Sequence, residues 1–133
     1  MEELLALFKA LSDRNRMRIV SALLTQESLC ACQLTELIQV SGATLSRHMG
    51  VLVSSGLVTS MKEGRWVHYS MSPEEGMNTS LLKWIEKRLS DDPQITMDFI
   101  ELERITSVDR EEICRKQRSS QCDSLKNEEM ELR

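Results

Sequence analysis

The sequence has no long apolar run: none of its 133 residues belongs to a hydrophobic stretch near the roughly 18 residues that a membrane-spanning helix needs. Its first residues, MEELLALF, are acidic and short, whereas a secretory signal begins with basic residues. It also contains no glycine-rich phosphate-binding loop and no nucleophile–base motif. These absences predict a cytosolic (cytoplasmic) protein that is not an enzyme and has no membrane partner.

Positive charge is scarce as well: the chain has 17 Lys and Arg against 21 Asp and Glu, which gives a formal net charge of −4. The excess of negative charge lies late in the chain. Residues 1–73 carry seven basic and six acidic side chains, a net of +1, while residues 74–133 carry ten and fifteen, a net of −5. Residues 41–71 hold three basic side chains and one acidic one, so we expect any DNA-binding surface to lie there.

Residues 30–57 have the pattern of two short helices joined by a tight turn. In the first helix, about residues 32–39, the side chains of Leu34, Leu37 and Ile38 share one face. The Val-Ser-Gly sequence that follows suits the end of that helix and the N-cap of the next. The second helix, about residues 43–55, ends at Gly56, because glycine readily adopts the left-handed backbone of helix ends. The stretch is therefore predicted to be a helix-turn-helix.

The two faces of the second helix differ in chemistry. One face carries apolar residues that we expect to be buried, namely Leu45, Met49, Leu52 and Val53. The other face is polar and cationic and suits a DNA major groove. The residues expected to contact DNA from this helix and its N-cap are Ser41, Thr44, Ser46, Arg47 and His48.

The next segment, residues 58–71, alternates in the manner of two paired strands and is rich in β-branched and aromatic residues. Residues 62–65, Lys-Glu-Gly-Arg, form the predicted hairpin turn, with Gly64 where a positive φ is needed. A basic-tipped hairpin after a recognition helix is a wing, so Lys62 and Arg65 are expected to meet phosphates or the neighbouring minor groove. The alternative is a hairpin that only covers the core.

Four further helices are predicted from apolar spacing, at residues 2–11, 14–25, 77–90 and 94–118. The fold class is then mainly α with a small β-hairpin, a winged helix-turn-helix. We divide the chain into a winged helix-turn-helix DNA-binding and dimerisation domain, a C-terminal helical extension and a flexible polar tail, at residues 1–92, 93–118 and 119–133.

Three arginines, Arg14, Arg16 and Arg18, lie close to the start of the helix predicted at residues 14–25. A solvated helix face is the simpler interpretation of this group, and direct contact with DNA phosphates is the alternative.

Four motifs in order resemble the ArsR family of bacterial and archaeal winged-helix repressors. They are LFKALSDRNRMRIVSAL (Leu7–Leu23), LCACQL (Leu29–Leu34), LSRHMGVLVSSGLV (Leu45–Val58) and KEGRWVHYSMSP (Lys62–Pro73). The resemblance covers about residues 2–92. It implies a homodimeric transcriptional repressor of the metalloregulatory kind, which binds an imperfect inverted repeat in double-stranded operator DNA and leaves it when a metal or metalloid binds.

The resemblance also implies that the helix at residues 77–90 pairs with the first helix across a two-fold axis. The apolar stripes on these two helices agree with a dimer, because they exceed what one small domain is expected to bury. The residues expected in the dimer contact are Leu4, Leu5, Phe8, Leu81, Ile85 and Leu89.

The pair Cys30 and Cys32 lies at the N-terminal end of the first helix of the motif. The helix dipole there favours thiolates, and soft thiolates select thiophilic ions. Two residues at i and i+2 of a regular helix diverge by about 200°, so both grip one ion only if the first turn is distorted. That conflict predicts a switch between a DNA-binding and an ion-bound geometry. Alternatively Cys30, in phase with Leu34, is a plain core thiol, while Cys32 is more exposed.

Family members that respond to arsenite and antimonite commonly have a third cysteine three residues after the pair, where this sequence has Thr35. The resemblance implies As(III) or Sb(III) as inducer, with no organic cofactor, but it leaves the third ligand open. The candidate metal ligands are all four cysteines of the chain, Cys30, Cys32, Cys114 and Cys122.

The family's other common site uses His and Asp or Glu on the helix before Pro93. We do not expect this zinc or nickel site here, because the two histidines of the chain, His48 and His68, both lie in the predicted DNA-binding elements.

Two other functions compete with an arsenical-resistance repressor. One is a repressor switched by thiol redox chemistry, through a disulfide that joins Cys30 or Cys32 to Cys114 or Cys122. The other is a winged-helix module for protein–protein assembly. The basic wing tip and Arg47 on the exposed helix face argue against this second alternative.

Overall fold

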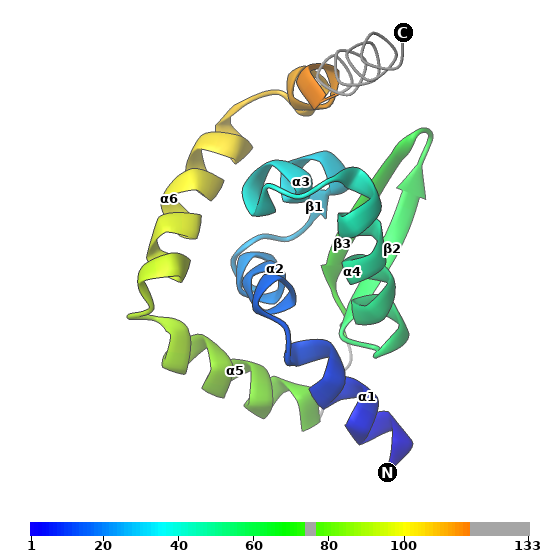
Figure 1. Cartoon of the computed structure of the whole chain (residues 1–133), viewed down its shortest axis with the longest axis vertical. Helices are drawn as coiled ribbons and strands as arrows, with labels where there is room; N and C mark the ends of the chain where they lie inside the picture. Colours follow the sequence, from blue (N-terminus) through cyan, green and yellow to red (C-terminus); the bar gives the residue numbers. More distant parts are fainter. Residues whose placement is uncertain (74–76, 118–133) are drawn as a thin grey trace, which may run out of the picture.

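The computed structural model describes residues 1–73 and 77–117, so the predicted tail at residues 119–133 lies outside the described part, as does Cys122. Within it, the helices α1–α6 and the three short strands β1–β3 follow one another along the chain (Figure 1). The helices are α1 (Glu2–Leu11), α2 (Arg14–Thr25), α3 (Ala31–Ile38), α4 (Gly42–Ser54), α5 (Met77–Leu89) and α6 (Pro93–Ser107). The strands are β1 (Leu29–Cys30), β2 (Val58–Glu63) and β3 (Trp66–Met71), and residues 110–117 are again helical.

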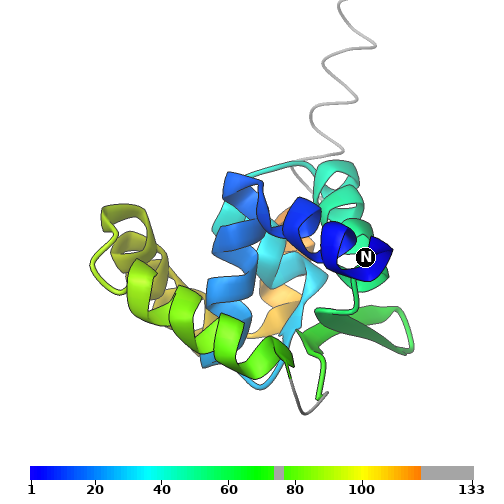
Figure 2. The same cartoon turned by 90° about the horizontal axis from the view of Figure 1, so that it is seen from below.

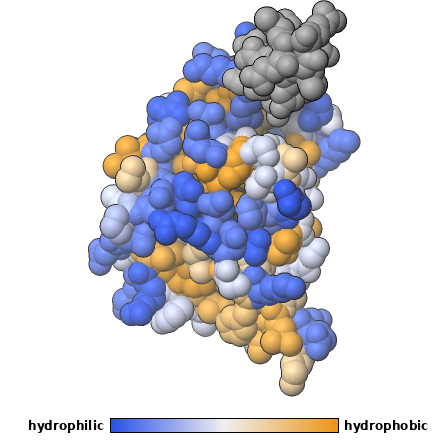
Figure 3. Space-filling model, in the orientation of Figure 1, coloured by the Kyte–Doolittle hydropathy of each residue, from blue (hydrophilic) through white to orange (hydrophobic). Residues whose placement is uncertain are grey.

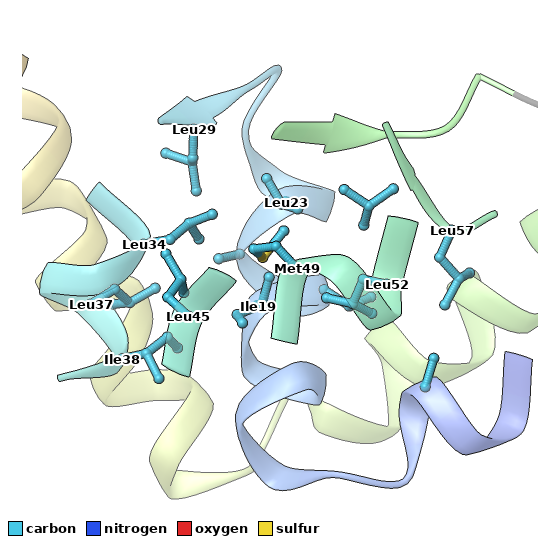
Figure 4. Packing of buried hydrophobic residues seen from close by; sticks show 14 of the residues in the cluster. Ile19, Leu23, Leu29, Leu34, Leu37, Ile38, Leu45, Met49, Leu52 and Leu57 are labelled. Atoms are coloured by element: carbon cyan, nitrogen blue, oxygen red, sulfur yellow. The ribbon is translucent and has the colours of Figure 1, made fainter. Parts of the chain in front are cut away.

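The hydrophobic core lies where α2, α3 and α4 meet (Figure 4). Ile19 from α2, Leu34 from α3 and Met49 from α4 are each at most 1% exposed. The buried faces predicted for α3 and α4 are therefore confirmed, with one exception. Val53, expected in the buried stripe of α4, is 36% exposed, since it lies at the edge of that stripe.

Local capping sets the ends of the helix-turn-helix. The Ser41 hydroxyl accepts a hydrogen bond from the Thr44 N–H at 3.1 Å and so caps α4, as its sequence position suggested. Gln39 takes the left-handed conformation that ends α3, with φ 62°. Gly56, with φ 84°, plays the same part just after α4. Together these residues turn the chain sharply between the two helices and away from the second.

The hairpin after α4 pairs β2 with β3 in antiparallel register, with Glu63 opposite Trp66 across the turn and Gly64 at φ 61°. The predicted wing is therefore present. The strand β1 was not predicted, because two residues give no period to detect. It joins the far edge of β3, so the strand order is β1-β3-β2 and Cys30 lies opposite His68.

The C-terminal part wraps around the helix-turn-helix. α5 and the start of α6 project on the side of α2 away from the hairpin, and α6 then runs along α2 and α3 (Figures 1 and 2). The single helix predicted at residues 94–118 is wrong, because α6 ends at Ser107 and Val108 is extended. A new helical segment begins at residue 110, where the Asp109 carboxylate accepts a hydrogen bond from the Glu111 N–H at 3.2 Å.

The buried face of α6 includes a charged residue. Ile95, Leu102 and Ile105 are buried, but Phe99 is 37% exposed and the neighbouring Asp98 takes the inward position. None of the helices formed by residues 1–73 and 77–117 combines the length and the apolar character needed to span a membrane.

Candidate DNA-binding surface and thiol site

The outer face of α4 carries the residues predicted to contact DNA, at different depths. Ser46 and Arg47 are exposed, while Thr44 is half-buried. The Ser41 hydroxyl, besides capping the helix, donates a hydrogen bond to the Thr44 hydroxyl at 3.0 Å. Arg47 is therefore the cation that α4 presents to solvent.

His48, predicted on the same face, instead lies against the junction of α1 and α2. Its Nδ1 atom is 3.1 Å from a guanidinium nitrogen of Arg16 and 4.0 Å from a carboxylate oxygen of Asp13. Arg16 in turn donates to the carbonyl oxygen of Ala10 at 2.7 Å. The histidine ring thus links α4 to the first two helices of the chain.

Asp13 is the N-cap of α2, and its carboxylate accepts a hydrogen bond from the Arg16 N–H at 3.0 Å. Burial alone would raise the pKa of this carboxyl group, but the hydrogen bond and the charges of Arg16 and His48 outweigh it. The pKa of Asp13 consequently lies below its ordinary value.

Arg18 does not belong to a solvated face, nor is it free for a phosphate. Its guanidinium group makes two hydrogen bonds to Asp98 of α6, at 2.8 and 2.9 Å, and one to the Leu37 carbonyl oxygen at 3.4 Å. The Gln94 side-chain amide also donates to the Asp98 carboxylate at 2.9 Å. The hydrogen bonds that Arg18 donates to the Asp98 carboxylate raise the pKa of Arg18. This ion pair ties α6 to α2 and to the end of α3.

Two cysteines that are 82 residues apart in sequence meet at the start of α3. Cys32 and Cys114 form a disulfide with a Cα–Cα distance of 5.5 Å. Cys30 is a free thiol, 1% exposed, and its backbone N–H donates to the Gln33 side-chain oxygen at 2.9 Å. The expectation that Cys30 is the more buried of the pair is confirmed.

A cavity of about 350 Å³ lies between the disulfide and residues 65–67, at the turn end of the wing. Its lining consists of Cys30, Ala31, Cys32, Arg65, Trp66, Val67, Cys114 and Gln117. Three of the four predicted metal ligands thus border one space. Within residues 1–73 and 77–117, however, no group of three or more His, Cys, Asp or Glu side chains is placed to hold a metal ion.

The helical segment at residues 110–117 is held in place by more than the disulfide. The Gln117 amide donates to the Cys32 carbonyl oxygen at 2.8 Å, and Ile113 is 6% exposed within the core. Arg110 lies 3.2 Å from a ring nitrogen of His68 on β3. The segment therefore contacts both α3 and the wing.

At the wing tip, Lys62 and Arg65 are exposed, as a phosphate-binding function would require. The guanidinium carbon of Arg65 lies 5.7 Å from the centroid of the Trp66 ring, and that of Arg110 lies at the same distance. His68 is also 3.4 Å from the Glu63 carboxylate. One aromatic ring thus receives a cation from the wing and another from the C-terminal segment.

The residues predicted at a dimer contact fall into two sets. The side chains from α1 are half-exposed: Leu4 is 50%, Leu5 53% and Phe8 51% exposed. This apolar surface is visible at the lower end of the molecule in Figure 3. The side chains from α5 lie against the chain's own core instead, because Ile85 is 5% exposed while Leu81 and Leu89 pack on the same cluster.

Four residues of this region escaped prediction from sequence: Trp66, Asp98, Arg110 and Gln117. Only Asp98 left a signal, because it occupies a position in phase with the apolar residues Ile95, Leu102 and Ile105 of α6. A charged residue within an apolar stripe implies a buried partner.

Comparison with known proteins gives a consistent set of relatives. A family model described as "Bacterial regulatory protein, arsR family" matches residues 13–60. The arsenical resistance operon repressor of Escherichia coli K12 is 43% identical over 67 residues, which are 50% of this chain and 57% of that repressor. The cadmium resistance transcriptional regulatory protein CadC of Listeria innocua is 45% identical over 62 residues, or 47% of this chain and 52% of CadC.

Among solved structures, the transcriptional regulator HlyU from Vibrio vulnificus is 30% identical, with a TM-score of 0.54, over 65% of this chain and 86% of HlyU. HlyU from Vibrio cholerae, with a TM-score of 0.56, is 28% identical over 67% of this chain and 90% of HlyU. The winged-helix fold class is thereby confirmed. These relatives are described as transcriptional regulators rather than enzymes, although the chain matches little more than half the length of the curated ones.

Proposed function

The chain belongs to the ArsR family of bacterial transcriptional regulators, and we propose that it is a cytosolic repressor that binds operator DNA and releases it when its thiols capture As(III) or Sb(III). The observation that carries the proposal is the meeting of Cys32 and Cys114 beside the wing, 82 residues apart in sequence. Thiophilic ions bind such a thiol pair strongly, and the pair lies next to elements that would touch DNA.

DNA binding would rest on α4 in the major groove and on the wing beside it. The exposed Arg47 would read a base edge, while Lys62 and Arg65 would contact phosphates. Ser41, Thr44 and Ser46 would line the same groove. His48 would contribute by holding α4 against Arg16 and Asp13.

Two copies would bind an imperfect inverted repeat. A protein with a net charge of −4 needs the DNA-binding surfaces of two protomers for useful affinity. The half-exposed apolar surface of Leu4, Leu5 and Phe8 supports α1 as part of the dimer contact, with α5 beside it. Residues 1–92 would then be the DNA-binding and dimerisation unit, and residues 93–118 the extension that carries Cys114.

The DNA surface is tested by two substitutions and a control. Arg47→Ala should reduce operator affinity by about 1–3 kcal/mol and relax specificity at one base pair. Arg65→Ala should weaken binding to all sequences alike and flatten its salt dependence. Arg88→Ala, an exposed arginine on α5, should change neither. Wild-type operator affinity in both variants would show that α4 and the wing are not the DNA contacts.

Capture of arsenite would use the reduced pair. Two thiols displace two hydroxyl groups of As(OH)₃ as water, which leaves one hydroxyl on an arsenic atom bridged by Cys32 and Cys114. The start of α3 favours the thiolate of Cys32. The third sulfur would come from Cys30, which borders the same cavity, from Cys122, or from an external thiol.

The sensor is tested by titrating strictly reduced protein on its operator with arsenite and antimonite. Cys32→Ser and Cys114→Ser should each keep DNA binding and lose the response, because serine preserves size but is a poor ligand for a soft ion. Cys30→Ser and Cys122→Ser identify the third sulfur. Full release of DNA by the reduced Cys32→Ser variant on adding arsenite would overturn the site.

A redox repressor is the second candidate, and the disulfide between Cys32 and Cys114 favours it. Here a peroxide would take two electrons and two protons from the thiol pair, and disulfide formation would release the operator. Peroxide without any metalloid, reversed by a dithiol reductant, distinguishes this function from arsenite capture under strict reduction.

A further inference from the structure

Trp66 lies between the thiol pair and the tip of the wing. Its ring borders the cavity beside Cys32 and Cys114. The same ring stacks with the guanidinium group of Arg65, a wing residue, and with that of Arg110, which belongs to the C-terminal segment. Among the residues that line the cavity, Trp66 is the aromatic one, and both arginines stack on it.

Arg110 and Cys114 are placed to move together. They lie one helical turn apart in the segment at residues 110–117, so they share a face of that segment. Cys114 is joined to α3, while Arg110 reaches β3, where it stacks on Trp66 and lies 3.2 Å from the ring of His68. A bond made at Cys114 therefore also fixes the position of Arg110 on the wing.

We propose that Arg110 and Trp66 are positioning residues: they transmit the binding of arsenite by Cys32 and Cys114 to the wing and so cause release of DNA. The proposal rests on the proposed function, because it assumes a repressor whose thiol pair binds arsenite. It names the contact between Arg110 and Trp66 as the route by which the arsenite-bound pair, called captured below, affects the wing.

The captured state would hold the wing in the conformation described above. With residues 110–117 fixed on α3, Arg110 holds Trp66 and His68, and Arg65 stays on the Trp66 ring instead of a phosphate. With free thiols, the segment is held only by weaker contacts, including the Gln117 hydrogen bond and the burial of Ile113. It then opens more often, which lets the wing adjust to DNA.

The coupling between capture and DNA binding is reciprocal, so it is measured as a ratio of two affinities. Operator affinity is measured for reduced protein and for protein captured by arsenite, in full-length chains with arsenic content assayed in parallel. The wild-type ratio is expected to be about tenfold or more. Arg110→Gln should reduce this ratio by about three- to tenfold, with unchanged affinity in the reduced state and unchanged arsenic binding.

Matched variants separate transmission from a structural role. Arg115→Gln removes the same charge from an exposed position of the same segment and should keep the wild-type ratio. Trp66→Phe retains an aromatic ring and should keep part of the response, whereas Trp66→Leu should lose most of it. Because Arg110 is exposed, its variant tests the proposal even if a Trp66 variant folds poorly.

The outcomes are distinct. A wild-type ratio in Arg110→Gln, with arsenic bound, would overturn the proposal while leaving the repressor intact. An equal loss of DNA affinity in reduced and captured Arg110→Gln would also overturn it, since Arg110 would then be a phosphate contact. Wild-type protein that binds arsenite and keeps its DNA would overturn the proposed function itself.

Discussion

The C-terminal extension is attached to the helix-turn-helix at two places, and the two attachments differ in chemistry. α6 is held through the ion pair between Arg18 and Asp98, whose side chains are 14% and 6% exposed. The segment at residues 110–117 is held through Cys32 and Cys114. Both attachments join residues about 80 positions apart, and both reach α3 or its end.

The difference separates a permanent attachment from a conditional one. A guanidinium–carboxylate pair keeps its charges throughout the physiological pH range, so a change of pH within that range does not break it. A thiol pair exists as free thiols, as a disulfide or as ligands of a soft ion, and each state holds the chain differently. The ion pair therefore belongs to folding, and the thiol pair is suited to regulation.

Removing one partner of the permanent attachment should have the largest effect. Asp98→Ala leaves the Arg18 charge buried without its carboxylate, so we expect unfolding free energy to fall by about 3–5 kcal/mol. The measurement is urea denaturation of reduced protein. Glu101→Ala, which breaks an exposed pair with Arg104 on the same helix, is the control and should cost at most about 1 kcal/mol. A loss as small as that of the control would show that α6 is not permanently held.

Closing the conditional attachment should have an intermediate and more local effect. Oxidation of Cys32 and Cys114 closes a loop of 82 residues, which should stabilise the fold by about 2–4 kcal/mol. Amide exchange should slow mainly in residues 110–117, while α6 changes little because the ion pair already holds it. Cys114→Ser should show no such change on oxidation. Equal slowing in α6 would mean that the two attachments are not independent.

The smallest effect is expected at the contact that joins α4 to the start of α2, where His48 lies against Arg16 and Asp13. Here the question is whether this contact is permanent as well. Asp13→Ala removes the N-cap of α2 and the carboxylate near His48, at a cost of about 1 kcal/mol at neutral pH. Because the folded pKa of Asp13 lies below 3.8, its stabilisation is present above that value and is lost as pH falls through the folded pKa.

Thermal denaturation from neutral to acidic pH measures this contribution. The Asp13→Ala variant should lack the corresponding loss of stability in acid. Asp13→Asn should keep most of the capping hydrogen bond yet show the same flat pH profile, which separates the hydrogen bond from the charge. A wild-type acid profile in both variants would assign the pH dependence to other carboxyl groups.

Much of the helix-turn-helix and its hairpin could be predicted from the sequence because their signals are local. Ser41 and Gly56 mark the limits of α4 through their own backbone and side-chain chemistry, and Gly64 marks the hairpin turn. The break after Ser107 could not be predicted, because the helical spacing continues across it and the cap at Asp109 is a weak signal. The inward turn of His48 was also missed, since it depends on Arg16 from another helix.

The sequence alone determined most of the helices, the hairpin, the buried faces of α3 and α4, and the exposed position of Arg47 on α4, because helical spacing and capping act within a few residues. It also marked the four cysteines as the candidate metal ligands. Only the tertiary structure decided that Cys114 meets Cys32, that Asp98 meets Arg18 and that Arg110 meets Trp66. Such pairings join residues more than 40 positions apart, and they depend on how packed helices fold back on one another, which no local pattern records.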